Sequence, residues 1–314
     1  MPKYRHNLPQ ISGGMFISDG GMETTFIFHQ GIELPEFASF VLLNTEAGIQ
    51  TLKNYYNDYA AIAQRHGVGF ILDTPTWRAN RDWGSKLGFS EQDLVQVNQR
   101  AVQFLLDMRD SIATDATRVV INGVIGPQAD GYVPSNIMSI EEATAYHLPQ
   151  IKTFAQTEAD MVTAYTLNYV EEAIGVALAA QSCNMPVAIS FTVETDGKLP
   201  TGDTFKQAIE RTDEVTGSYP AYYMINCAHP LHFQQSLSPD GNWLSRIRGI
   251  KANASQKSHA ELNEATQLDD GNPVELGSYY RTLKNQFNHL SVLGGCCGTD
   301  HRHIEEICKS VLLN

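Results

Sequence analysis

The sequence lacks any long apolar run, and nothing in it approaches the about 20 consecutive apolar residues of a membrane-spanning helix. The N-terminal stretch Met1–His6 does not lead into the apolar segment of a secretory signal either. We therefore expect a cytoplasmic protein that has no membrane partner.

Positive charge is also scarce. The chain has 22 Lys and Arg against 35 Asp and Glu, a formal net charge of −13, and no block of like charge. Nucleic-acid binding depends on clustered Lys and Arg that neutralise phosphates. The charge balance argues against a nucleic-acid partner and favours small-molecule partners, while the oligomeric state stays open.

Cysteines are few, five in 314 residues. An odd number at this low density does not suit the disulfide framework of a small secreted domain. Cys183 and Cys308 lie in or beside helical stretches, and we expect both to be small core residues.

Two of the other cysteines, Cys296 and Cys297, are adjacent and flanked by glycines. Adjacent cysteines do not readily bond to each other, and the glycines let both sulfurs point to one place. This pattern favours half of a metal site. Cys227, at the end of a strand-like run, is the best third ligand, although burial as ordinary apolar cysteines is the alternative.

Low-complexity segments are absent, and short apolar runs alternate with amphipathic stretches along the whole chain. Alternation of this kind predicts βα units, and eight of them predict a closed (βα)8 TIM barrel, an α/β fold. The expected strands are Met15–Ser18, Val68–Leu72, Val119–Ile125, Met161–Ala164, Val187–Thr192, Tyr222–Asn226, Ile247–Lys251 and Leu290–Leu293. The expected helices include Gly48–His66, Glu91–Ser111, Val170–Ala180 and Glu275–Asn288.

Two connections stand out. Pro149 interrupts the third crossover, and because proline fits poorly inside a helix we predict two helical pieces there. The polar stretch Asn253–Pro273 is longer than a usual βα connection, which makes it either a lid or partner surface or a plain insertion.

The barrel prediction places the cysteines at one end. Catalytic groups of such barrels follow the strands, and Cys227 follows the sixth expected strand while Cys296 and Cys297 follow the eighth. Three sulfurs distant in sequence can therefore converge. Asp19 and Thr74, after the first and second strands, fall on the same rim.

Three thiolates leave a tetrahedral Zn²⁺ one open position, which separates a catalytic zinc from a structural one. Sulfur ligands favour zinc over magnesium, calcium or manganese. A thiol that enters the open position would lose its proton and become a nucleophile. The residues themselves therefore predict a site that activates a thiol as a sulfur nucleophile.

Asn226-Cys227, the downstream Gly294–Gly298 and the early Asp19–Met22 resemble the signature of the homocysteine S-methyltransferase family. That family includes betaine- and S-methylmethionine-dependent enzymes and the homocysteine domain of cobalamin-dependent methionine synthase. The resemblance covers nearly the whole chain and implies one barrel domain over residues 1–314, a zinc cofactor and a role in methionine biosynthesis. It also implies methyl transfer to homocysteine or a related thiol.

The donor is not visible in the sequence. No cobalamin- or folate-binding domain accompanies the barrel in these 314 residues. We therefore expect a free small donor of the S-methylmethionine, S-adenosylmethionine or betaine type. A cationic donor suits aromatic walls, and Trp77, Tyr132 and Trp243 lie near expected rims, although core packing is the commoner role of each.

The resemblance also assigns substrate contacts. Asp19 and Thr74 match residues that hold the amino-acid part of homocysteine in the family. Tyr165 stands where the family carries a glutamate for the substrate ammonium, and Glu23 stands where a small residue is usual. Either Glu23 receives the ammonium instead, or the acceptor is a thiol without an amine in that place.

Two histidines follow the cysteines closely in the sequence. His303 resembles a structural family residue, and His229 is a possible contact to the substrate or to a ligand. A zinc-holding barrel that binds a thiol or senses redox state without methyl transfer is the alternative function. A zinc hydrolase is disfavoured because the chain has neither a His-rich ligand set nor an HExxH motif.

Overall fold

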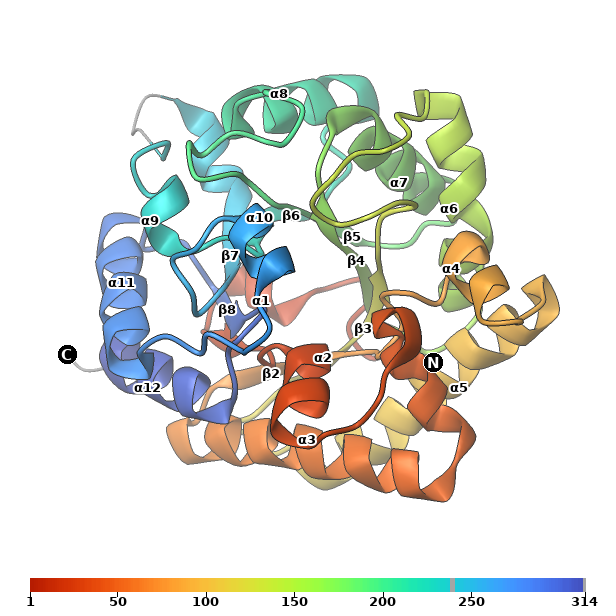
Figure 1. The fold of residues 1–314 in the computed structure, drawn as a ribbon, viewed down its shortest axis with the longest axis horizontal. Coiled ribbons are helices and arrows are strands. Elements are labelled where there is room, and N and C mark those ends of the chain that lie inside the picture. Colours follow the sequence, from red (N-terminus) through yellow and green to blue (C-terminus); the bar gives the residue numbers. More distant parts are fainter. Residues whose placement is uncertain (238–240, 313–314) are drawn as a thin grey trace.

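The computed structural model describes residues 1–237 and 241–312, and its centre is a closed barrel of parallel strands (Figure 1). Each strand pairs with the next along the chain, and β1 closes the ring by pairing with β8 through Phe16 and Val292. The strands are β1 Phe16–Ile17, β2 Gly69–Asp73, β3 Val119–Ile125, β4 Met161–Leu167, β5 Val187–Phe191, β6 Tyr222–Asn226, β7 Ile247–Ala252 and β8 Val292–Gly295. The predicted TIM barrel is confirmed.

Four strands end later than predicted, β2 and β7 by one residue and β4 and β8 by more. The two larger differences concern the site. β4 continues to Leu167, so Tyr165 lies within the strand. β8 includes Gly294 and Gly295, which pair with Lys251 and Ala252 of β7. Glycine is a weak strand former by itself, but a Cβ on Gly294 would lie 2.1 Å from Ser18 Oγ, so close packing requires it here.

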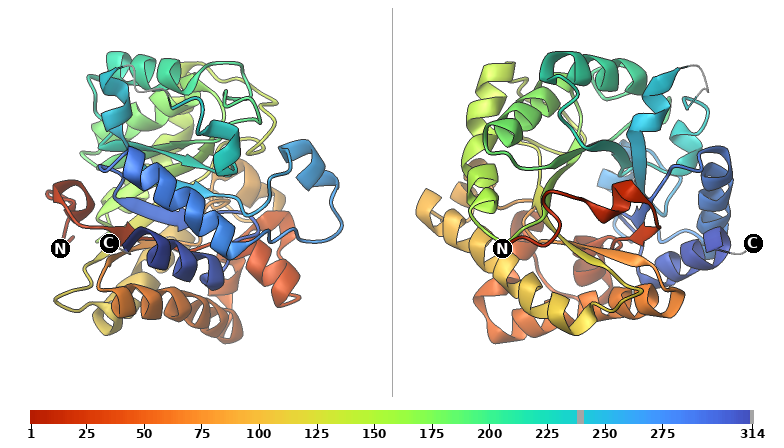
Figure 2. Two further views of the ribbon diagram at one scale, coloured as in Figure 1. Left: turned by 90° about the vertical axis from the view of Figure 1, so that its left-hand side faces the viewer. Right: turned by 180° about the vertical axis from the view of Figure 1, so that it is seen from behind.

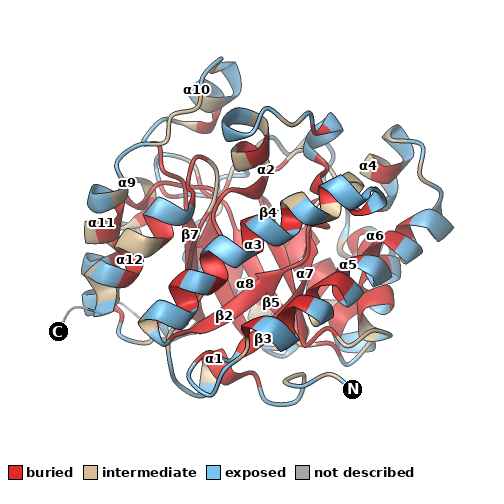
Figure 3. Cartoon of the chain, turned by 90° about the horizontal axis from the view of Figure 1, so that it is seen from below, coloured by how far each residue is buried: buried red, intermediate tan, exposed pale blue. Residues whose placement is uncertain are grey.

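Helices cover the outside of the barrel, and their inner faces are buried whereas their outer faces are exposed (Figure 3). The α-helices are α1 Pro9–Ser12, α2 Met22–Thr24, α3 Glu46–His66, α4 Arg81–Lys86, α5 Glu91–Ile112, α6 Ile140–Ala155, α7 Val170–Ser182, α8 Phe205–Thr216, α9 Pro230–Phe233, α10 His259–Glu264, α11 Pro273–Gln286 and α12 His301–Leu312. Shorter turns of 3₁₀ or π type are η1 Thr25–His29, η2 Pro35–Phe37, η3 Ser39–Asn44 and η4 Asn242–Arg246. The four helices predicted by range correspond to α3, α5, α7 and α11.

Local sequence explains where the long helices start and stop. Thr45 caps α3 by accepting a hydrogen bond from the Gly48 amide, and Gly67 ends the helix with a left-handed φ of 63°. A capping box between Ser90 and Asp93 starts α5 in the same manner.

The prediction of two helical pieces around Pro149 is wrong, because α6 runs through it from Ile140 to Ala155. Proline removes one backbone hydrogen bond of the helix, and tertiary packing outweighs that loss. α6 lies so close to α7 that a Cβ on Gly175 would be 2.4 Å from the Cβ of Ala143. Thr153 Oγ1 also donates to the Pro149 carbonyl at 2.9 Å.

The N-terminal segment closes the amino end of the barrel, seen from behind in the right-hand view of Figure 2. The Tyr4 amide donates to Asp160 Oδ1 at 2.7 Å, just before β4, and the buried side chain of Gln10 lies against Met161 and Tyr222. The opposite, carboxyl end is left for the site.

The stretch from Asn253 to Pro273 contains α10 and projects from that carboxyl end (Figure 2, left). Its Asn263 reaches the cavity described below. None of the described helices has both the length and the hydropathy of a membrane span.

Candidate functional site

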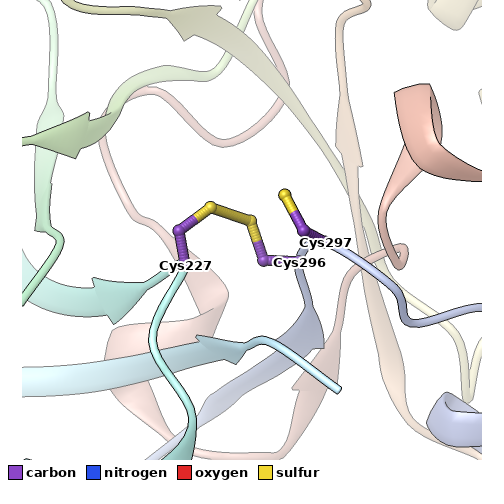
Figure 4. Close-up of side chains that lie close together, drawn as sticks. All are labelled: Cys227, Cys296 and Cys297. Atoms are coloured by element: carbon purple, nitrogen blue, oxygen red, sulfur yellow. A yellow bond between two sulfur atoms is a disulfide. The ribbon is translucent and has the colours of Figure 1, made fainter. Parts of the chain in front are cut away.

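The three predicted cysteines meet at the carboxyl end of the barrel (Figure 4). Cys227 directly follows β6, and Cys296 and Cys297 directly follow β8. Their sulfur atoms all lie within 4.8 Å of one another. Two thiolates that share a zinc ion, each about 2.3 Å from it, lie within about 4.6 Å of each other, so this cluster fits one ion with small side-chain adjustments.

The backbone of Cys227 is held in an unusual conformation. Its φ is 54°, in the left-handed region that a cysteine rarely adopts. The Cys227 carbonyl accepts hydrogen bonds from Asn253 Nδ2 at 3.1 Å and Thr192 Oγ1 at 3.3 Å, and it lies 2.6 Å from His259 Nε2. These contacts fix the direction in which the sulfur leaves the strand.

Glycines bring the first strand against the Cys296 turn. A Cβ on Gly21 would lie 2.5 Å from the Cys296 carbonyl oxygen, and one on Gly295 would lie 2.0 Å from Thr299 Oγ1. The Thr299 hydroxyl donates to the Cys296 carbonyl at 2.7 Å. The glycines that marked the motif in the sequence are therefore needed for close backbone approach.

The structure joins Cys227 and Cys296 in a disulfide, and Cys297 stays free beside it (Figure 4). A disulfide cannot supply two thiolate ligands, so disulfide and metal are alternative states of the same sulfurs. Tyr132 Oη lies 3.4 Å from Cys297 Sγ, and burial raises the pKa of that thiol.

The cluster opens into a cavity of about 200 Å³. The three predicted metal ligands and the four residues that the family resemblance assigns to the substrate all line this cavity: Asp19, Glu23, Thr74, Tyr165, Cys227, Cys296 and Cys297. The strands that carry them are far apart in the sequence, so the barrel brings the predicted set together.

Asp19 is buried at the end of β1 and paired with a lysine of the same chain. Lys251 Nζ, from β7, donates to Asp19 Oδ1 at 2.6 Å and to Asp73 Oδ2 at 2.8 Å. Tyr55 Oη donates to the other oxygen of Asp19 at 3.1 Å. Burial raises the pKa of Asp19 to about 6 although Lys251 opposes the rise, so Asp19 is ionised at neutral pH.

Tyr165 belongs to the same network. Its hydroxyl donates to Asp73 Oδ2 at 3.0 Å, and Lys251 Nζ lies 5.0 Å from the centre of its ring. Asn122 Nδ2 donates to the other Asp73 oxygen at 2.6 Å. Burial lowers the pKa of the Lys251 ammonium, but Asp19 and Asp73 outweigh this and hold the pKa above its ordinary value.

Thr74 and Glu23 also have partners within the protein. The Thr74 hydroxyl accepts from the Val124 amide at 2.8 Å and lies 2.6 Å from Thr76 Oγ1, so it supports the strand ends. Glu23 Oε1 accepts from Ser39 Oγ at 2.8 Å, and burial raises the Glu23 pKa.

The three aromatic residues expected near the rim lie in two different places. Trp77 and Tyr132 line the cavity, and the Tyr132 ring stacks on His259 of α10 at 3.9 Å between centroids. Trp243 lies in η4 ahead of β7 and packs in the core near Phe205, so its expected place at the rim is wrong.

Neither of the two histidines considered in the sequence analysis lines the cavity. His229 caps α9 through its Nδ1, lies outside the cavity lining, and has its pKa lowered to about 4 by burial. His303 contacts Asp300 and the Asp270 carbonyl at the start of α12, a structural position.

Lys251, Asp73 and Arg78 were missed from the sequence. Each is a charged residue at or just after the carboxyl end of a buried strand, which was an available signal. Lys251 falls inside the seventh expected strand, and Asp73 directly precedes Thr74, the residue that the family resemblance singles out.

Comparisons with known proteins confirm the family that the motifs predict and the barrel fold. The family model for homocysteine S-methyltransferase matches residues 16–311. Among solved structures, the chain is similar to the homocysteine methyltransferase MmuM from Escherichia coli, with 17% identity. Its oxidized form has a TM-score of 0.74 over 97% of this chain and 99% of that chain. Its metallated form has a TM-score of 0.71 over 95% and 96%.

The likeness to MmuM, at this identity, concerns the fold. The family model carries the assignment because it spans almost every described residue, from the first strand to the last helix. The chain therefore belongs to the homocysteine S-methyltransferase family and is a methyltransferase.

Proposed function

We propose that this chain is a zinc-dependent S-methyltransferase that moves a methyl group from a small free donor to homocysteine or a related thiol. Cys227, Cys296 and Cys297 would hold the zinc ion. The observation that carries the proposal is the convergence of three sulfurs from two strand ends on one cavity. Bound zinc would lower the pKa of the acceptor thiol and keep its sulfur nucleophilic at neutral pH.

The reaction balances without a further reagent. The acceptor sulfur supplies the electron pair of the new S–CH₃ bond, and the bond between the methyl carbon and the donor heteroatom breaks with its pair left on the donor. The thiol proton passes to solvent. The chain's contribution is then to orient both molecules in line and to exclude water, and such positioning lowers the entropic barrier by several kcal/mol.

The cavity supports a cationic donor of the S-methylmethionine, S-adenosylmethionine or betaine type. Trp77 and Tyr132 supply aromatic faces, and Glu23 and Asp130 supply negative charge. Asp19, Thr74 and Tyr165 would shape the acceptor side. We further propose that residues 1–314 form one domain and that the protein works in the reducing cytoplasm, where the thiolates survive.

The test is a screen of three donors against several thiols by mass spectrometry, with zinc-loaded protein under reducing conditions. The proposal predicts catalytic formation of a methylated thiol in the wild type and its loss in Cys297→Ser. Thiol binding without turnover for every donor would reject it.

The disulfide favours one second candidate. A barrel whose Cys227 and Cys296 switch between disulfide and metal would sense redox state without methyl transfer. That function predicts zinc release on mild oxidation and no methylated product in the same screen.

A further inference from the structure

Each carboxylate oxygen of Asp19 and Asp73 already accepts at least one hydrogen bond from the protein. The two oxygens of Asp19 accept from Lys251 and Tyr55. Those of Asp73 accept from Asn122, Lys251 and Tyr165. An ammonium group of a substrate that approached this place would have to compete with the positive charge of Lys251 for these two carboxylates.

Burial stabilises the ion pairs of Lys251 with Asp19 and Asp73 against competition from a ligand. The side chains of Lys251, Asp19 and Asp73 are only 8%, 5% and 5% exposed. Separating a buried ion pair leaves charges uncompensated in a site of low polarity, which is strongly unfavourable. Lys251 will therefore not give up its place to a competing ammonium at neutral pH.

Arg78, unlike Lys251, is a buried cation that has no carboxylate partner close to it in the described part of the chain. Its residue is 5% exposed and lines the cavity, with the guanidinium packed 4.0 Å from the Trp77 ring centre and 3.6 Å from that of Trp83. Nη1 donates to the Ala129 carbonyl at 3.1 Å, whereas the buried Nε has no partner among the described residues.

No carboxylate of the described chain lies within 4.0 Å of the Arg78 guanidinium, and Asp130, Glu23 and Glu36 act on it only from farther away. A buried guanidinium without an ion-pair partner is costly unless a ligand supplies the anion. Its planar set of donors matches a carboxylate in two-point geometry.

We propose that the acceptor is a mercapto acid, a thiol that carries a carboxylate but no ammonium group on the carbon next to it. Arg78 binds the carboxylate, and Lys251 occupies the place where an ammonium would be received. Glu23, which accepts one hydrogen bond from Ser39, is then left to face the cationic donor. This inference rests on the proposed methyl transfer, whose acceptor class it names.

Four thiols of matched chain length separate the two charges: homocysteine has both, 4-mercaptobutanoate has the carboxylate only, 3-mercaptopropylamine has the ammonium only, and 1-propanethiol has neither. Their Kd values are measured by calorimetry on zinc-loaded full-length protein without any donor. We expect the carboxylate to tighten binding and the ammonium to weaken it, each by about tenfold, the effect of one charged hydrogen bond gained or lost.

Two variants assign the effects to residues. Lys251→Met opens Asp19 and Asp73 to a ligand, so the ammonium should then strengthen binding. Arg78→Gln should abolish the advantage of the carboxylate and leave 1-propanethiol unaffected. The exposed Lys53→Met and Arg281→Gln serve as matched controls and should behave as the wild type.

The Kd values of the four thiols for the wild type test the inference even if Lys251→Met does not fold. Tighter binding of homocysteine than of 4-mercaptobutanoate overturns the inference about the acceptor. In that case, methyl transfer to homocysteine would still support the proposed function. Preference for 4-mercaptobutanoate with no methylated product from any donor supports the inference about binding and rejects the function.

Discussion

Cys227 and Thr166 both adopt positive φ, 54° and 63°, where β6 and β4 reach the cavity. Asn226 joins them: its Oδ1 accepts from the Thr166 amide at 2.9 Å, and its Nδ2 donates to Thr166 Oγ1 at 2.8 Å. Such backbone conformations cost about 1–3 kcal/mol each and persist where the surroundings fix them. Here they aim a sulfur and a hydroxyl into the same cavity.

Replacing one sulfur should release the metal. With Cys297→Ser, two thiolates remain, which is fewer than zinc sites require. Elemental analysis of protein purified under reducing conditions should find about one zinc per wild-type chain and most of it lost in the variant. Cys183→Ser, on the outside of the barrel, is the control and should keep its zinc. Full zinc content in Cys297→Ser would remove Cys297 from the ligand set.

Asp300 predicts a pH dependence of stability. Burial raises its pKa, but the contact with His303 and the hydrogen bonds that Arg302 donates outweigh this and hold the pKa well below its usual range. Because the folded-state pKa is depressed, ionised Asp300 stabilises the fold above the unfolded pKa of about 3.9, and the contribution is lost as the pH falls towards the folded value.

The comparison with Asp300→Asn measures that contribution. At pH 6 the variant should lose about 1–3 kcal/mol of unfolding free energy in denaturant titrations. The gap to the wild type should shrink below about pH 4, as the wild-type carboxylate takes up its proton. The exposed Asp115→Asn is the control. A gap that stays constant down to pH 2 contradicts this account of Asp300.

Among single residues, the cysteine ligands could be predicted from the sequence because Cys296 and Cys297 form a local motif. A barrel also brings its strand ends together, so Cys227 could be predicted to join them. Lys251 could not be placed in this way. Its partners lie 232 and 178 positions away, and only the closed barrel decides that its ammonium meets Asp19 and Asp73 and not solvent.

At the scale of elements, the turn after β1 and the turn after β8 pack against each other through glycine. Gly21 has an ordinary φ of −77°, so alanine there brings no backbone strain. Its Cβ would nevertheless lie 2.5 Å from the Cys296 carbonyl oxygen. The clash is with backbone, so one of the two turns has to move.

We therefore expect Gly21→Ala to weaken zinc binding while the barrel stays folded. Zinc affinity is measured by competition with a chromogenic chelator, and folding by circular dichroism. Gly31→Ala is the matched control, because its Cβ meets nothing within 4 Å although its φ is 65°. It should lose some stability and keep its zinc. Equal zinc affinity in the two variants would show that the β1–β8 contact does not position Cys296.

Element boundaries were harder to predict than element order. The alternation of apolar runs with amphipathic stretches predicted the order of the strands, whereas β8 extended over two glycines that look like a turn. α6 continued through Pro149 because its packing against α7 is tertiary and has no local signature.

At the scale of the whole molecule, the barrel has a large core that is independent of the cysteine cluster, and the cluster lies at its rim. Zinc should then contribute little to folding, unlike zinc in a small finger. After chelation under reducing conditions, the far-ultraviolet circular dichroism should match that of the zinc-loaded protein. Loss of helical signal on chelation would make the metal structural.

The most direct test of the account is methyl transfer followed with a trideuteromethyl-labelled sulfonium donor in zinc-loaded, zinc-stripped and zinc-restored protein. The account predicts that the labelled methyl group appears on the thiol sulfur in the loaded protein, disappears on stripping and returns with about one zinc per chain, the occupancy of a single three-cysteine site. Equal transfer in the stripped protein would contradict it.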